Sequence, residues 1–125
     1  MNKIMIVDDN PEVRVVIKAT LEREGYEVIE AENGTRCLEI LYSGEKPDLI
    51  LLDIMMPDLD GWEVARRIKS NENLKGIIIC MLTAKTSTMD ALMSLESASA
   101  NWHLNKPISK QKLLETVKWL IQKPS

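Results

Sequence analysis

Five polar side chains stand where short apolar runs of the sequence stop. In chain order they are Asp8, Asp9, Asp53, Thr83 and Lys106. Three carboxylates brought close together repel one another, so they need a lysine, a proton or a hard cation as compensation. Mg²⁺ suits such a set, because it takes oxygen ligands and is usually held by one or two carboxylates together with a phosphate. A carboxylate beside Mg²⁺ can attack a phosphoryl group and form an acyl phosphate.

The two remaining polar residues suit the same chemistry. Thr83 can donate a hydrogen bond to a phosphoryl oxygen, and Lys106 can pair with another. Stabilisation of a phosphoryl group depends mainly on positioning and charge neutralisation, which these groups would supply together. All five must first be brought to one place, and the elements around them indicate how.

The apolar runs before these residues are typical of β-strands buried on both faces. Such strands occur in parallel sheets, and their sequences are continuous runs of apolar residues rather than alternating apolar and polar residues. The expected strands are residues 4–7, 28–31, 49–52, 77–82 and 102–105. The carboxyl ends of parallel strands form one edge, and ligands bind there at the point where strand order reverses. The five polar side chains should therefore converge at that edge.

Amphipathic stretches separate the expected strands. Helices are expected from Asn10-Pro11 to Gly25, after Asn33-Gly34, over about residues 62–70, over about residues 87–95, and after Ser109. This alternation predicts an α/β fold with one doubly wound, five-stranded parallel sheet and five helices. The length of 125 residues is near that of one compact domain, so a single domain over residues 1–125 is expected.

Composition excludes several classes of function. The net charge of -3 argues against nucleic-acid binding by this chain, since such proteins usually carry a basic stripe. The longest apolar run, residues 77–82, is too short to span a bilayer, so no membrane partner is expected. Cys37 and Cys80 form no CxxC pair and cannot make a zinc site with the lone His103. Such sparse cysteine use fits a reducing compartment and predicts a cytoplasmic location.

Four segments of the chain resemble the signature segments of response-regulator receiver domains from two-component signalling. They are IMIVDDNPEVR, DLILLDIMMPDLDGWEV, MLTA and LNKPI, in the order and near the spacings of that family. The resemblance covers essentially the whole chain and implies the chemotaxis-regulator-like, flavodoxin-like receiver fold. Its implied strand order, 2-1-3-4-5, puts Asp8-Asp9 beside Asp53.

The resemblance also implies a role for each acidic residue. Asp53 matches the phosphoacceptor, and Asp8 and Asp9 match the pair that binds Mg²⁺ directly or through water. The backbone carbonyl of Met55 is implied as a further metal ligand. The implied function is that of a phosphoacceptor module, which takes a phosphoryl group from a histidine kinase or phosphotransfer protein. It would then switch the face that binds a downstream protein target, and catalyse only its own aspartyl phosphorylation and dephosphorylation.

On the opposite side of the expected site, Thr83 matches the switch hydroxyl of the family and Lys106 the phosphate-pairing lysine. Lys106-Pro107 matches a peptide bond that is typically cis. The segment between Thr83 and Lys106 is one residue longer than the common spacing. The aromatic switch position is therefore filled by either His103, three residues before Lys106, or Trp102.

Two residues predict a long-lived phosphorylated state. In receiver domains the side chains two residues past the acceptor and two past the switch hydroxyl flank the path of the attacking water. Here they are Met55 and Lys85. A thioether is a weak acceptor and an ammonium only donates, so neither positions water well.

Three other functions compete with this interpretation. A phosphatase of the haloacid-dehalogenase type would want an Asp-x-Asp arrangement at the first strand, whereas Asp8 and Asp9 are adjacent. A flavodoxin-like cofactor binder would want a phosphate-cradling loop where this chain has Asp-Asp-Asn-Pro. A receiver-like module that is never phosphorylated would not need the complete set of site residues.

Overall fold

A computed structural model of the chain describes residues 2–83 and 100–122. Five parallel strands form one sheet in the order β2-β1-β3-β4-β5, which confirms the expected topology. The strands are β1 (Lys3–Val7), β2 (Glu27–Ala31), β3 (Leu49–Asp53), β4 (Ile78–Thr83) and β5 (Trp102–Asn105). Their bounds lie within one residue of those expected from the apolar runs.

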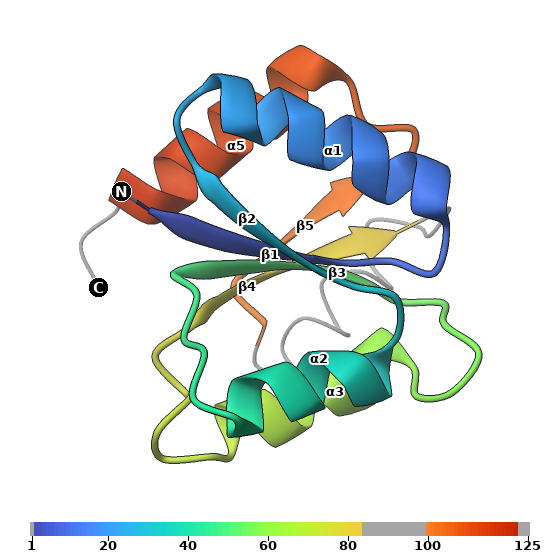
Figure 1. Cartoon of the computed structure of the whole chain (residues 1–125), viewed down its shortest axis with the longest axis vertical. Coiled ribbons are helices and arrows are strands. Elements are labelled where there is room, and N and C mark those ends of the chain that lie inside the picture. Colours follow the sequence, from blue (N-terminus) through green and yellow to red (C-terminus); the bar gives the residue numbers. More distant parts are fainter. Residues whose placement is uncertain (1, 84–99, 123–125) are drawn as a thin grey trace.

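Helices cover both faces of the sheet (Figure 1). Helices α1 (Pro11–Arg23) and α5 (Lys110–Gln122) lie on one face, and α2 (Gly34–Tyr42) and α3 (Gly61–Lys69) lie on the other. The described ranges hold four helices where the sequence predicted five. The remaining expected helix, at about residues 87–95, lies outside the described residues.

Side-chain hydrogen bonds cap α1 and α5 at the starts that the sequence predicted. The Asn10 side chain accepts a hydrogen bond from the backbone N–H of Glu12 at 2.9 Å, and Pro11 takes the first helical position of α1. Gly25, with φ of 91°, follows the end of this helix in the left-handed region. The Ser109 hydroxyl accepts from the backbone N–H of Lys112 at 3.0 Å at the start of α5.

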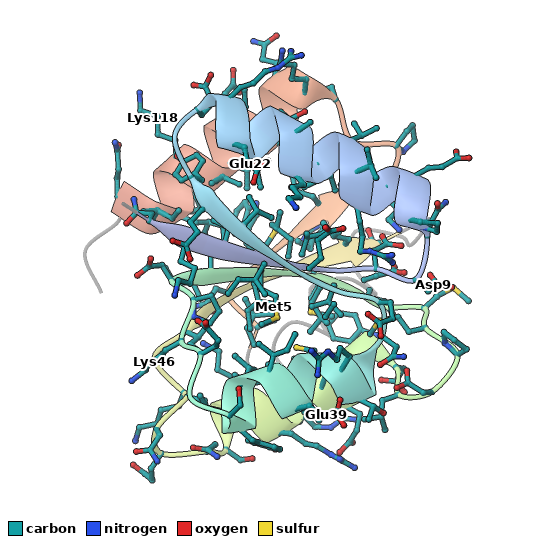
Figure 2. All side chains as sticks on the ribbon, in the orientation of Figure 1. Met5, Asp9, Glu22, Glu39, Lys46 and Lys118 are labelled. Carbon is teal, nitrogen blue, oxygen red and sulfur yellow. The ribbon has the colours of Figure 1, made fainter. Side chains whose placement is uncertain are left out.

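The sheet has an apolar core on each face. Along β1, Met5 and Val7 belong to the cluster under α2 and α3, whereas Ile4 and Ile6 belong to the cluster under α1 and α5. In Figure 2, Met5 lies in the interior of the molecule, and charged side chains such as Glu39 point outward. Both faces of the central strands are therefore buried, as the continuous apolar runs indicated.

Neither cysteine of the chain is in a disulfide. Cys37 and Cys80 are both buried, and burial raises the pKa of each thiol to about 12. Both thiols therefore stay protonated and pack as small apolar side chains. No helix in residues 2–83 or 100–122 has the length and hydropathy needed to cross a bilayer.

Candidate functional site

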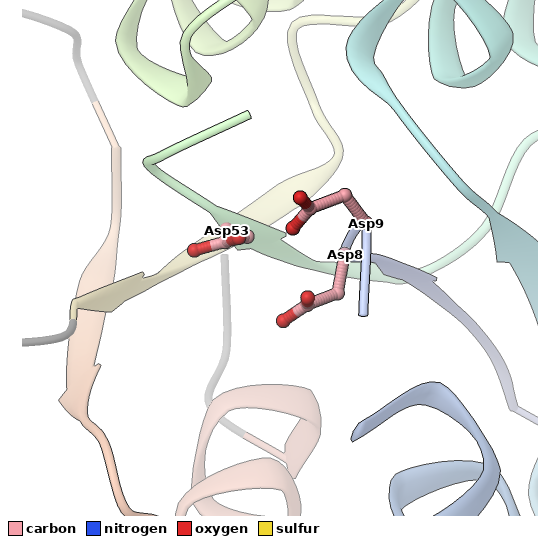
Figure 3. A group of neighbouring side chains, drawn as sticks. All are labelled: Asp8, Asp9 and Asp53. Carbon is pink, nitrogen blue, oxygen red and sulfur yellow. The ribbon is translucent and has the colours of Figure 1, made fainter. Parts of the chain in front are cut away.

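The three predicted carboxylates meet at one edge of the sheet. Asp8 and Asp9 directly follow β1, Asp53 is the last residue of β3, and these two strands are hydrogen-bonded neighbours. One carboxylate oxygen from each residue lies within 4.8 Å of the others (Figure 3). Asp8 and Asp53 are buried, whereas Asp9 is exposed to solvent. The topology thus brings together residues 45 positions apart in the sequence.

Lys106 inserts its ammonium group between two of these carboxylates. Its Nζ lies 2.8 Å from Oδ2 of Asp8 and 3.4 Å from Oδ1 of Asp53. The other Asp8 oxygen accepts a hydrogen bond from the backbone N–H of Asn10 at 2.9 Å. Both oxygens of Asp8 therefore have a partner within the chain, so Asp8 is held rigidly at the end of β1.

Burial and repulsion act against the charge on Asp53. Burial and then the negative charge of Asp8 raise the pKa of Asp53, while Lys106 and the backbone N–H of Met55 oppose this shift. For Lys106, burial alone would lower the pKa, but the bonds and charges of Asp8 and Asp53 outweigh it and raise the pKa. The ammonium is thus firmly charged, and it partly offsets the repulsion between the carboxylates.

The loop that follows Asp53 packs tightly against it. The N–H of Gly61 donates to the carbonyl of Ile54 at 2.8 Å. A Cβ at residue 61 would overlap the backbone carbonyl of Asp53, so only glycine fits there. Asp60 begins α3 by accepting from the backbone N–H of Glu63 at 2.9 Å. The Asp-Gly pair of the sequence motif therefore sets the course of the loop back to the sheet edge.

Asp58 attaches this loop to the start of α2. Its carboxylate accepts from the backbone N–H of Thr35 at 2.8 Å and of Gly34 at 3.3 Å. Slight burial raises the pKa of Asp58, but bonds from Thr35 and from the backbone N–H of Leu59 and Gly34 outweigh it and lower the pKa to about 2. Met55, in the same loop, is 73% exposed.

Thr83 and Lys106 stand at the ends of β4 and β5, as predicted. Thr83 is fully buried, and its backbone carbonyl accepts from the N–H of Lys106 at 2.6 Å. Its hydroxyl donates to Oδ1 of Asn105 at 2.6 Å. The peptide bond between Lys106 and Pro107 is cis, which confirms what the family resemblance implied.

The two candidates for the aromatic switch position lie on opposite faces of β5. His103 pairs with Met81, and residues two apart on a strand share a face, so His103 lies on the same face as Asn105 and Thr83. Trp102 turns toward α5, where its ring meets that of Trp119 edge-on at 5.0 Å. Of the two, His103 lies on the same face as Thr83, the residue that the family resemblance matches to the switch hydroxyl.

Three contributors to the site did not emerge from sequence reasoning. Arg14 donates to the backbone carbonyl of Asp8 at 2.6 Å, and its Nε lies 3.3 Å from Oε1 of Glu30. Asn105 accepts a hydrogen bond from Thr83, and Asp58 holds the loop after Asp53 against the start of α2. The adjacency of Asn105 to Lys106 could have drawn attention to it, but the contact depends on strand register. Lys85, predicted to flank the water path, lies outside the described residues.

The donor set suits Mg²⁺. Every side chain in the cluster offers oxygen, the ligand atom that Mg²⁺ prefers. Three carboxylates face one lysine, so negative charge remains that a divalent cation would neutralise. Asp9, exposed at the rim, leaves the cluster accessible from solvent.

Comparison with known proteins points to one family. A family model described as the response regulator receiver domain matches residues 4–118. The chain is 30% identical to the chemotaxis protein CheY4 of Vibrio cholerae, with a TM-score of 0.89 over 96% of this chain and 98% of that one. It is 32% identical to the receiver domain of a signal transduction histidine kinase from Syntrophus aciditrophicus, with a TM-score of 0.87 over 100% and 96%. It is 34% identical to the BeF3-activated N-terminal receiver domain of Klebsiella pneumoniae RstA, with a TM-score of 0.87 over 98% and 100%.

Proposed function

The chain belongs to the response regulator receiver domain family, and from this premise we propose that Asp53 accepts a phosphoryl group in a two-component phosphorelay. The donor is a histidine kinase or a phosphotransfer protein. Receiver domains are regulatory and catalyse only their own phosphorylation chemistry, and we propose that residues 1–125 act as one such domain. The observation that carries the proposal is the cluster of Asp8, Asp9 and Asp53, with Lys106 inserted between two of the carboxylates.

In the proposed reaction Asp53 is the nucleophile. A carboxylate oxygen of Asp53 forms a bond to phosphorus while the phosphorus–nitrogen bond to the donor histidine breaks. The imidazole leaves with the electron pair of that bond and takes a proton from its surroundings. The geometry supports this role because Asp53 is held by a buried strand and is only 5% exposed.

The acid pair and the loop after Asp53 would hold Mg²⁺. We propose Asp9, Asp53 and the backbone carbonyl of Met55 as ligands, with Asp8 acting directly or through water. Both Asp8 oxygens already accept hydrogen bonds from the chain, which favours the water-mediated arrangement. When bound, Mg²⁺ would neutralise charge on the phosphoryl oxygens.

Thr83 and Lys106 would bind the phosphoryl group once it is attached to Asp53. The Lys106 ammonium, already beside Asp53, would pair with one phosphoryl oxygen, and Thr83 would donate to another. Both adjoin β5, so the change would reach the face formed by β5, α5 and the segment expected to form the fourth helix. That segment lies outside the described residues. We propose that a downstream protein binds this face.

We also propose a cytoplasmic location for the protein. Support comes from its two cysteines, Cys37 and Cys80, which are unpaired and buried. Unpaired thiols are typical of proteins from reducing compartments.

The proposed function can be tested by labelling with a small phosphodonor. Acetyl phosphate and Mg²⁺ should label the parent protein with an acid-labile phosphoryl group, and Asp53→Asn should abolish the label. Asp60→Asn is the matched control, because asparagine also caps helices and Asp60 lies in the same loop. Label that persists in Asp53→Asn would contradict the assignment. A parent protein that takes no label would favour the receiver-like module that is never phosphorylated.

A further inference from the structure

The hydroxyl of Thr83 already has an acceptor at the end of β4. Its Oγ1 donates to Oδ1 of Asn105 at 2.6 Å, while the backbone carbonyl of Leu104 lies farther away, at 3.4 Å. A separation of 2.6 Å is at the short end of the range for hydroxyl hydrogen bonds. Asn105 is therefore the principal acceptor of this hydroxyl.

A threonine hydroxyl has one proton and donates one hydrogen bond at a time. While the proton points at Asn105, Thr83 cannot donate it to a phosphoryl oxygen on Asp53. This step rests on the proposed function of Asp53. We infer that Asn105 is a positioning residue, which holds the Thr83 hydroxyl in the unphosphorylated state and releases it when Asp53 is phosphorylated.

Strand register places residue 105 opposite the hydroxyl. Thr83 and Asn105 are register partners in the parallel pairing of β4 with β5. The bond from the Lys106 N–H to the Thr83 carbonyl, at 2.6 Å, holds the two strand ends together just beyond this pair. The side chain at position 105 therefore decides whether the hydroxyl finds a side-chain acceptor before phosphorylation.

The bond to Asn105 reduces the free energy that Thr83 contributes to binding a phosphoryl group, compared with a hydroxyl that has no partner to leave. Hydrogen bonds to charged acceptors are roughly twice as strong as bonds between neutral groups, so transfer to a phosphoryl oxygen is favourable. The bond to Asn105 must break first, and this reduces the net gain. Asn105 is exposed, so its amide can bind water after release. Asn105 thus sets how much the Thr83 hydroxyl contributes to the affinity for a phosphoryl group on Asp53.

Titration with beryllofluoride in the presence of Mg²⁺ tests this inference, with binding measured by isothermal calorimetry. Asn105→Leu removes the acceptor while keeping similar volume. We expect it to tighten the apparent Kd by about threefold to tenfold, the equivalent of one neutral hydrogen bond. Asn105→Asp supplies a charged acceptor and adds negative charge beside the phosphoryl site. We expect it to weaken binding by about threefold or more.

A double-mutant cycle separates positioning from a general structural effect. In a Thr83→Val background the Asn105→Leu substitution should lose its effect on Kd, because the hydroxyl through which Asn105 acts is absent. Asn73→Leu, on the exposed surface before β4, is the control for adding an apolar side chain and should leave Kd unchanged. If the leucine variant folds poorly, Asn105→Ala also removes the acceptor and gives the same test.

The outcomes distinguish this inference from the proposed function. If the parent binds beryllofluoride but Asn105→Leu leaves Kd unchanged, the proposed function stands and the role of Asn105 is wrong. The role is equally wrong if Asn105→Leu changes Kd by the same factor in both Thr83 backgrounds. A parent protein that fails to bind beryllofluoride with Mg²⁺ overturns the proposed function and this inference together.

Discussion

The two sides of the site are built on different parts of the sheet. The acid side, formed by Asp8, Asp9 and Asp53, lies at the carboxyl ends of β1 and β3, and each of these strands pairs with a strand on both flanks. Every residue of β3 is buried. The switch side, formed by Thr83 and Asn105, involves β5, an edge strand with exposed residues at both ends.

Under the proposed function, this difference separates the part of the site that transfers the phosphoryl group from the part that signals it. Phosphoryl transfer depends on precise placement of groups, and the acid side is fixed by buried strands, by Lys106 and by the N–H of Asn10. A signal requires a part of the molecule with two arrangements of similar free energy. On the switch side the Thr83 hydroxyl donates to the Asn105 amide, and under the proposed function it would exchange this acceptor for a phosphoryl oxygen.

Lys106 joins the two sides, so its loss should give the largest effect on stability. Lys106→Met should lower the free energy of unfolding by about 2 kcal/mol at pH 7, since it leaves the buried carboxylates uncompensated. This loss is smaller than that expected for a fully buried ion pair, because the Lys106 side chain is partly exposed. The raised pKa of Lys106 means that its contribution is fully present below the ordinary lysine pKa of 10.5 and is lost as pH rises through the folded-state pKa.

Urea denaturation with and without Mg²⁺ measures this effect. Added Mg²⁺ should recover part of the loss, because the cation supplies positive charge to the same carboxylates. Lys110→Met, at the exposed start of α5, should be nearly neutral and serves as the control. A Lys106→Met protein as stable as the parent would show that this lysine does not compensate the charge of the buried carboxylates.

The next largest effect concerns dephosphorylation, for which the family resemblance implies that Met55 and Lys85 flank the path of the attacking water. Met55→Asn combined with Lys85→Glu should speed loss of the phosphoryl group about tenfold, since a water-positioning contact worth about 1.4 kcal/mol changes a rate by that factor. Neither substitution should change Mg²⁺ affinity much. Decay of the label after removal of phosphodonor measures the rate, and equal or slower decay in the double variant would refute the prediction.

Asp53→Asn should stabilise the protein in the absence of Mg²⁺, by about 1 kcal/mol near neutral pH. The pKa of Asp53 is raised by burial and by Asp8, so its ionised form disfavours folding. The Asp53 carboxylate takes up its proton at a higher pH in the folded protein than in the unfolded protein. The stability gained by Asp53→Asn should therefore shrink as pH falls through the folded-state pKa, because the protonated Asp53 no longer disfavours folding. Thermal unfolding of both proteins across pH 3–7 tests this, and a less stable variant at pH 7 would contradict it.

The smallest effect should come from the hydrogen bonds by which Asp58, in the loop after Asp53, contacts the start of α2. Asp58→Asn keeps the oxygen acceptor for Thr35 but removes the charge, which should cost about 0.5 kcal/mol at neutral pH. Because the pKa of Asp58 is lowered to about 2, its contribution is present above the ordinary aspartate pKa and is lost as pH falls toward 2. Urea midpoints of parent and variant should converge in acid, and a constant difference would show that charge is not the cause.

Residue patterns predicted the strands and the edge of the sheet at which the acid side lies, and the family resemblance implied the strand order. This was possible because the apolar runs of β1, β3 and β4 each stop at a candidate site residue, as the run in β3 stops at Asp53. The contacts of Asn105, Arg14 and Asp58 could not be predicted, because they depend on side chains from separate elements. Asp58 contacts α2 from a loop 23 residues later, a distance that no local pattern encodes.

The central claim is that Asp53 carries the phosphoryl group, and chemical mapping tests it most directly. Borohydride reduces an acyl phosphate on aspartate to homoserine, so the acceptor can be located by the mass of its peptide. After treatment with acetyl phosphate and Mg²⁺, we expect homoserine at position 53 and none in the untreated protein. Homoserine at Asp8, Asp9 or any other aspartate, with Asp53 unmodified, would contradict the account.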